Sequence, residues 1–173
     1  SIEYLNKDSE ELPFYMEPLA IIVMEDHIRE DAIDTIKWFK ENDVKIKIIS
    51  GDKPLTVAEI AKRVGVNDTE SFINLEGLSE TQVINAANKY TVFGRVTPEQ
   101  KAILVKAMKA QGNTVAMTGD GVNDILALKE ADCSVAMASG SDAAKNVSQL
   151  VLLDSNFDAM PQVVYEGRKT VNN

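Results

Sequence analysis

The chain has 173 residues, 45% of them apolar and 26% charged, which is the composition of a soluble globular protein long enough to bury one core. Its 27 acidic and 18 basic side chains give a net charge of −9, which argues against binding to nucleic acid or to an anionic membrane. No stretch approaches the ~18 consecutive apolar residues of a membrane span. The single Cys133 and the single His27 argue against a disulfide, a zinc site and a Ser-His-Asp triad.

In the first third of the chain, strand-like and helical patterns alternate. Apolar runs at 19–24 and 44–49 predict two buried strands. Between them, apolar residues from Ile33 onward recur at helical spacing. Pro54 marks the first position of the next helix and Gly65 its end. This alternation predicts an α/β domain with a mainly parallel sheet.

The rest of the chain continues the alternation. Ser79 to Gln82 forms a capping box that opens a helix to about residue 88, and a strand is predicted at 90–94. A stronger box begins at Thr97, with Pro98 at the first helical position, and its helix ends near residue 112. Four further elements are predicted: a strand at 114–117, a helix through 131, a strand at 134–137 and an amphipathic helical tail at 157–173.

A small polar cluster follows the strand at 44–49. Ligands of open α/β sheets bind beyond the carboxyl ends of the strands. Ser50, Gly51 and Asp52 place a hydroxyl and backbone amides there, before a helix N-terminus, where they can donate to phosphate oxygens. Taken alone, the cluster is explained at least as well by an ordinary strand-turn-helix connection.

A second cluster follows the strand at 114–117. Gly119 and Gly121 allow a sharp turn and a close backbone approach to a ligand. Asp120 and Asp124 are four residues apart across the turn into a helix, so both can face one hard cation. Mg²⁺ takes oxygen ligands, few of them from protein, which suits this pair. Helix capping by Asp124 accounts for one aspartate, but not for Asp120, Asn123 and both glycines together.

Lys101 lies in the first turn of the helix after Pro98, where a cation opposes the helix dipole. It is therefore a candidate for neutralising a phosphate, as phosphoryl transfer requires. A solvated surface lysine is the simpler explanation when this residue is considered alone. No Walker-type loop and no dinucleotide-binding glycine motif occurs in the chain.

Together, Ser50-Gly51-Asp52, Pro98-x-x-Lys101 and the segment 118–124 resemble the haloacid-dehalogenase superfamily. More narrowly, they resemble the C-terminal part of the phosphorylation domain of P-type (E1-E2) cation-transporting ATPases. The match runs from about Leu19 to the C-terminus, and 118–124 is its most specific part. The resemblance implies a Rossmann-like, mainly parallel sheet with helices on both faces. It also implies one partial domain over 1–173, a poorly ordered or hinge segment at 1–17 and the start of a stalk helix at 157–173.

The resemblance also assigns roles to individual residues. It implies that Asp120 and Asp124 hold Mg²⁺, that Lys101 neutralises the phosphate and that Asn123 contacts it. It implies phosphate or nucleotide binding by Ser50, Gly51, Asp52 and Gly119. The segment 26–29 resembles the family's Asp-Pro-Pro-Arg stretch, with His27 and Ile28 in place of both prolines.

One family motif, the Asp-Lys-Thr-Gly-Thr that contains the phosphorylated aspartate, is absent from these residues. The resemblance therefore implies a sheet without the strand of the nucleophile, and a chain that is inactive in isolation. The parent protein implied is a multi-pass pump that uses Mg²⁺ and ATP. The resemblance also implies that this chain lies on the cytoplasmic face of the membrane and acts with nucleotide-binding, actuator and membrane domains of the same polypeptide. The resemblance leans toward a divalent cation such as calcium, but ion selectivity is set by membrane-helix residues that these 173 residues do not include, so the sequence does not assign the ion.

Two other functions remain open at this stage. A soluble phosphatase of the same superfamily shares the Gly-Asp and Asn-Asp chemistry, but it should carry an Asp-x-Asp nucleophile near the N-terminus, and none is present at a strand end here. The third hypothesis is a non-catalytic module that binds Mg²⁺ or phosphate. Hydrolysis of a generic aryl phosphate separates the phosphatase from the other two.

Overall fold

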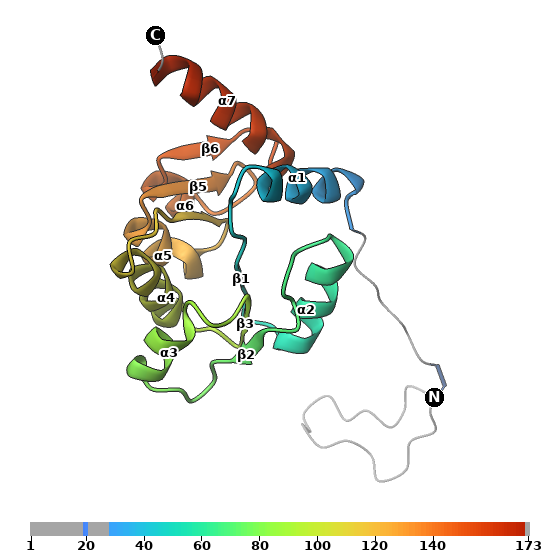
Figure 1. Ribbon diagram of the computed structural model, residues 1–173, viewed down its shortest axis with the longest axis vertical. Coiled ribbons are helices and arrows are strands. Elements are labelled where there is room, and N and C mark those ends of the chain that lie inside the picture. The colour runs from blue at the N-terminus through green and yellow to red at the C-terminus, as the bar shows by residue number, and fades with distance from the viewer. Residues whose placement is uncertain (1–18, 21–27, 172–173) are drawn as a thin grey trace, which may run out of the picture.

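The structure is a computed structural model that describes residues 19–20 and 28–171. Its helices are α1 (Glu30–Glu41), α2 (Pro54–Arg63), α3 (Glu80–Ala86), α4 (Pro98–Ala110), α5 (Ile125–Glu130), α6 (Asp142–Val147) and α7 (Met160–Val171), with short 3₁₀ turns η2 (Val122–Asp124) and η3 (Phe157–Ala159). Its strands are β1 (Ile48–Ile49), β2 (Phe72–Asn74), β3 (Val92–Gly94), β4 (Ala116–Gly119), β5 (Cys133–Met137) and β6 (Leu150–Leu152). Strands and helices alternate through most of the chain (Figure 1), which confirms the predicted α/β class.

The strands form two three-stranded sheets rather than one. The first has the order β1-β3-β2 and the second the order β4-β5-β6, and every neighbouring pair is parallel. Within the described part of the chain, the outer strands are each paired on one side only: β1 and β2 in the first half-sheet, β4 and β6 in the second. The predicted parallel sheet is thus present as two halves, each of which has an open edge strand.

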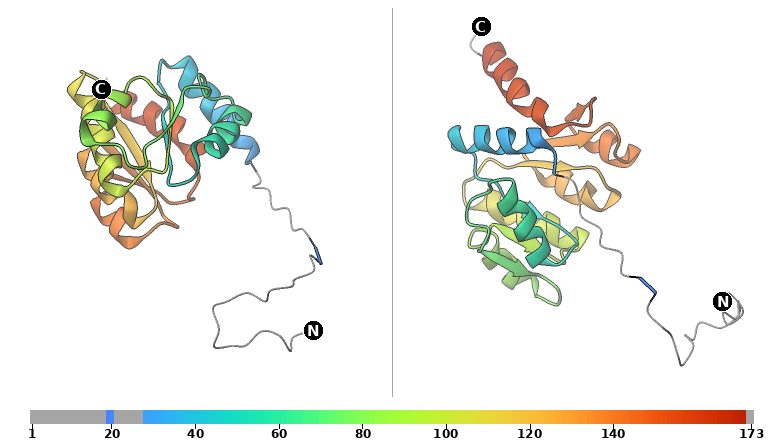
Figure 2. Two further views of the ribbon diagram at one scale, coloured as in Figure 1. Left: turned by 90° about the horizontal axis from the view of Figure 1, so that it is seen from below. Right: turned by 90° about the vertical axis from the view of Figure 1, so that its right-hand side faces the viewer.

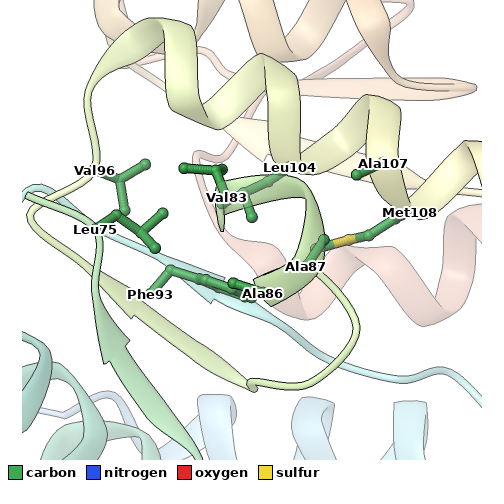
Figure 3. Close-up of a cluster of buried hydrophobic side chains, with 9 residues drawn as sticks. All are labelled: Leu75, Val83, Ala86, Ala87, Phe93, Val96, Leu104, Ala107 and Met108. Carbon is green, nitrogen blue, oxygen red and sulfur yellow. The ribbon is translucent and has the colours of Figure 1, made fainter. Parts of the chain in front are cut away.

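Helices cover both faces of the first half-sheet. Because successive residues of a strand point to opposite faces, Val92 and Phe93 of β3 enter two different cores. Phe93 is fully buried against α3 and α4, among Val83, Leu104 and Met108 (Figure 3). On the other face, Val92 packs against Val57, Ala58 and Ala61 of α2. Burying a side chain the size of Phe93 contributes about 1.5–3 kcal/mol.

The second half-sheet is also covered on both faces. The helices α5 and α6 pack against β4 and β5. The core on the other side contains Phe39 of α1, Val135 of β5, Leu152 of β6 and Met160 of α7. The Phe39 ring stacks on Phe157 with ring centroids 5.4 Å apart. Figures 1 and 2 show α1 lying beside β6 and α7, which joins the beginning of the described chain to its end.

Several predicted boundaries are corrected by the structure. The strand predicted at 44–49 is restricted to Ile48–Ile49, and Val44 is 44% exposed, because a turn with Asp43 at φ 58° precedes it. The strand predicted at 114–117 lies at Ala116–Gly119, two residues later. The strand β2 and the helix α6 were not predicted. The helical tail predicted at 157–173 is confirmed as η3 and α7 up to residue 171.

The predictions for the N-terminal region fall mostly outside the described residues. Residues 1–17 lie outside them, and so do residues 21–24 of the strand predicted at 19–24. Leu19 is described and is 95% exposed, so the burial predicted for it is wrong. Of the segment 26–29, only Ile28 and Arg29 are described.

Candidate functional site

The loop after β4 is organised by the carboxylate of Asp124. Its Oδ2 accepts hydrogen bonds from the backbone N–H groups of Gly121, at 3.1 Å, and Asp120, at 3.3 Å. Asp124 is only 7% exposed. Its side chain makes no capping bond to α5, the helix that follows it, but points back into the loop. Asp124 therefore sets the shape of the turn that presents Asp120.

The other oxygen of Asp124 is paired with Lys101. The Lys101 Nζ lies 2.6 Å from Asp124 Oδ1, and the two side chains are only 12% and 10% exposed. Lys101 is held in the first turn of α4 by the capping box between Thr97 and Gln100, in which each side chain bonds to the other's backbone N–H. Because α4 follows β3 and Asp124 follows β4, this ion pair joins the carboxyl ends of the two half-sheets.

Only glycine fits at two positions, Gly119 and Gly140, where the loops after β4 and β5 meet. A Cβ on Gly119 would lie 2.6 Å from Asp124 Cβ and 2.8 Å from its Cγ, far closer than atoms pack. A Cβ on Gly140, in the loop after β5, would lie 2.6 Å from the carbonyl oxygen of Asp120. The same carbonyl accepts a 2.7 Å hydrogen bond from the Ser141 N–H. The backbone of Asp120 is thus held between the loops after β4 and β5.

The cluster after β1 is folded onto the loop after β3. The Ser50 hydroxyl accepts from the Asp52 N–H at 3.1 Å, and the Ser50 carbonyl accepts from the Val96 N–H at 3.1 Å. The Arg95 N–H donates to the Asp52 carbonyl at 2.9 Å, with Arg95 in the left-handed region at φ 54°. A non-glycine residue there is uncommon and stores strain, which is typical of functional loops. Val96 and Thr97 then lead directly into α4.

Comparison with known proteins decides the family. Residues 2–132 match the family described as haloacid dehalogenase-like hydrolase. The chain belongs to this family. The order of its parallel strands and helices agrees with that assignment, and the Rossmann-like fold predicted from the sequence is confirmed.

Relatives of this chain include a probable cation-transporting ATPase, exp7, of Streptococcus pneumoniae. It is 42% identical over 173 residues, which is the whole of this chain and 22% of the relative. The calcium-transporting ATPase CtpE of Mycobacterium tuberculosis is 42% identical over 166 residues, covering 96% of this chain and 21% of the relative. The chain thus spans about a fifth of the length of these relatives.

Solved structures agree with the sequence relatives. A zinc-transporting PIB-type ATPase in the E2.Pi state matches with a TM-score of 0.67 and 27% identity, over 86% of this chain and 20% of that one. The catalytic domain of the CPx-ATPase CopB-B matches with a TM-score of 0.61 and 30% identity, over 79% of this chain and 45% of that one. The resemblance to P-type cation-transporting ATPases is confirmed. Within the described residues, no helix is long and apolar enough to cross a membrane.

The carboxylates of Asp120 and Asp124 differ in how freely they can bind Mg²⁺. Both oxygens of Asp124 are occupied by Lys101 and by backbone amides, whereas the side chain of Asp120 is exposed and makes no hydrogen bond or ion pair within the described chain. The described residues contain no cluster of three or more acidic, His or Cys side chains that could hold a metal. Mg²⁺ commonly uses one or two carboxylates and completes its shell with water and phosphate oxygens. The site therefore fits Mg²⁺ through Asp120, with Asp124 supporting the loop.

The structure brings some predicted residues together and leaves others apart. Lys101, Asp120 and Asp124 form one connected group, and Gly119 lies against it. Asn123 lies in η2 and is exposed. Within the described chain, no hydrogen bond joins 50–52 directly to this group, and the link runs through the backbone of 95–97. The roles of these residues remain predictions.

No site role was predicted from the sequence for Gly140 and Ser141. Both contact Asp120, although they follow it by about twenty positions. One available signal was a glycine between two serines shortly after a predicted buried strand. Of the segment 26–29, Arg29 donates to Asn156 Oδ1 at 3.3 Å and to the Ser155 carbonyl at 3.4 Å, which ties the start of α1 to the loop after β6.

A carboxylate also fixes the beginning of β4. Asp132 Oδ2 accepts from the Val115 N–H at 2.9 Å, and Asp132 Oδ1 pairs with Lys109 Nζ at 3.2 Å. The hydrogen bond from Val115 and then the Lys109 ammonium hold the pKa of Asp132 below its usual value. The start of β4 is therefore tied to the start of β5 at the end opposite the candidate site.

Proposed function

We propose that this chain is the C-terminal part of the phosphorylation domain of a P-type ATPase, which binds Mg²⁺ and the aspartyl-phosphate while ATP hydrolysis drives cation transport. The observation that carries the proposal is the buried Lys101–Asp124 pair across the two half-sheets, with the exposed Asp120 carboxylate on the same loop. The length of the relatives supports placing the chain within a larger polypeptide.

The phosphorylated aspartate belongs, in this proposal, to a strand between β1 and β4. Both strands have an open edge, and both half-sheets are parallel, so one further parallel strand can pair with each of them. The carboxyl end of such a strand would lie between the loop at Ser50 and the loop at Asp120. The nucleophile would then meet both predicted phosphate-binding loops at once.

The chain's own residues would act mainly by position and charge. Asp120 holds the metal, which supplies charge neutralisation when bound. The Ser50 hydroxyl and the Gly51 N–H donate to phosphoryl oxygens, and Asn123 and Gly119 line the same face. Lys101 is held by Asp124 and presents its ammonium to the phosphoryl group, whose charge grows during transfer. Asp52 shapes the Ser50 loop beside the nucleotide.

The remaining assignments follow from the same proposal. Residues 1–17 would form a hinge segment and 157–173 the start of a stalk helix, in a multi-pass pump whose phosphorylation domain faces the cytoplasm. Nucleotide-binding, actuator and membrane domains would be its partners. The relatives named as calcium-transporting support Ca²⁺ as the first cation to test. The chain alone would be inactive, and hydrolysis of an aryl phosphate by it would favour the phosphatase alternative.

The test is phosphoenzyme formation in the parent protein from radiolabelled ATP. Asp120→Asn keeps the shape of the side chain but removes the charge, so acid-stable phosphoenzyme should fall to background while expression is unchanged. Asp154→Asn is the matched control, because Asp154 is exposed and lies outside the site. A normal phosphoenzyme level in Asp120→Asn would refute the assignment.

A further inference from the structure

A second candidate site lies at the opposite end of the first half-sheet. A cavity of about 650 Å³ is formed by the segments that lead into β1, β2 and β3, the end of α1 and the loop after α2. Its charged lining consists of Lys40, Lys45, Lys47, Lys89, Asp43 and Asp68. None of the residues assigned to the phosphoryl site contributes to it.

The cavity concentrates positive charge in an acidic protein. Four lysines and two aspartates line it, so its formal charge is 4 − 2 = +2, whereas the whole chain carries −9. Within the described chain, none of the four ammonium groups has a carboxylate within ion-pair distance. Lys45 and Lys89 are exposed, and their ammonium groups have no hydrogen-bond partner in that part of the chain. The ammonium groups of Lys45 and Lys89 are therefore free to bind an external anion.

The other two lysines are fixed in the cavity wall. Lys47 Nζ donates to the Tyr90 carbonyl at 2.6 Å and lies 5.7 Å from the centroid of the Phe93 ring. Lys40 Nζ donates to the Gly65 carbonyl at 3.2 Å. Partial burial, and then the charge of Lys45, lower the pKa of Lys47. A bound anion would raise this pKa again, because a nearby opposite charge favours the charged ammonium.

We propose that this cavity binds a phosphate-bearing anion. Lysine is a common phosphate ligand that acts as a point charge, and four lysines surround one space here. Asn67 and Asn88, which also line the cavity, add neutral N–H donors. The volume falls within the range of small-molecule sites, about 300–1,000 Å³, and exceeds the needs of a single phosphate. A polyphosphate, or a phosphorylated headgroup of a lipid, fits this chemistry.

The experiment is an NMR titration of the ¹⁵N-labelled chain with pyrophosphate in metal-free buffer. The backbone amides of the cavity, Asn67, Asp68 and Thr91, should shift in a saturable manner. Those of Gly51 and Gly119 should not shift at the same concentrations, which separates this cavity from the phosphoryl site. Shifts confined to Gly51 and Gly119, or no saturable shift, would overturn the proposal. Its outcome is independent of the phosphoenzyme test.

Paired variants test the lysines themselves. Lys45→Gln/Lys89→Gln removes two exposed charges and should weaken pyrophosphate binding about tenfold, since each exposed charge contributes roughly threefold to the affinity. Lys106→Gln/Lys129→Gln removes the same charge from exposed helical positions outside the cavity and should leave the affinity within about twofold. Equal weakening by both pairs would mean non-specific attraction and would contradict a site.

Flotation with lipid vesicles separates the two sources of phosphate. Capture by phosphatidylglycerol vesicles but not by phosphatidylcholine vesicles, lost in Lys45→Gln/Lys89→Gln alone, would identify a lipid headgroup as the ligand. Saturable pyrophosphate shifts without vesicle capture would identify a free phosphorylated molecule. The absence of both would overturn the proposal.

Discussion

Replacing Gly119 by alanine tests the packing of the candidate site most sharply. The new Cβ would lie 2.6 Å from Asp124 Cβ, 2.8 Å from Cγ and 2.9 Å from Oδ2, so either the backbone of β4 or the Asp124 side chain must move. Overpacking of this kind costs about 1–3 kcal/mol. Because displacement also stretches the buried Lys101–Asp124 pair, we expect a loss near the upper end of that range.

Urea unfolding of the chain, followed by the fluorescence of Trp38, measures this loss as a lower midpoint at unchanged slope. Gly121→Ala is the matched control. A Cβ there meets Asp124 Oδ2 at 3.5 Å, which is ordinary contact, and Gly121 has φ −99°, which alanine adopts freely. We expect it to change stability by less than about 0.5 kcal/mol. Equal losses at both positions would refute the proposed close packing of Asp124 on Gly119.

Three further predictions follow from the site and its supports. Lys101→Met leaves Asp124 buried without its cation and should cost about 3 kcal/mol in urea unfolding, whereas Lys106→Met, at an exposed position of the same helix, should cost little. Thr97→Ala removes the cap of α4 and should cost about 1 kcal/mol, and a silent substitution would contradict the capping box. An NMR titration of Asp132 should give a pKa below 3.8, because the Val115 N–H and the Lys109 ammonium favour the charged form of its carboxyl. A lowered pKa stabilises the fold above about pH 3.8, so this stabilisation should be lost only as the pH falls through the lowered value. A pKa above 3.8 would contradict the contacts of Asp132 with Val115 and Lys109.

Local interactions explain why most of the helices were predictable. The box at Thr97 and Gln100 is formed by residues three apart, and the structure contains both of its hydrogen bonds. The box at Ser79 is equally local and is also present. Strand limits depend instead on a neighbouring strand. The run at 44–49 alternates β-branched residues with two lysines before Ile48 and Ile49, and it pairs with β3 only at these last two residues.

The candidate site was predictable to the extent that its residues are close in sequence. Asp120 and Asp124 lie on one turn, and their proximity follows from that spacing. The pairing of Lys101 with Asp124 joins residues that are 23 positions apart and depends on how α4 packs beside β4. The contact of Gly140 with Asp120 depends on the pairing of β4 with β5. Neither contact leaves a periodic pattern in the sequence, so only the fold reveals them.

The proposal that this chain is one part of a membrane pump is tested most directly by the size and location of the native protein. An antibody raised against the chain would be used on fractionated cells. Since the chain covers 22% of a relative that matches it along its whole length, we predict a band four to five times longer than the chain, in the membrane fraction. A band of the chain's own size in the soluble fraction would contradict the account and would leave a free-standing protein that lacks the nucleophile.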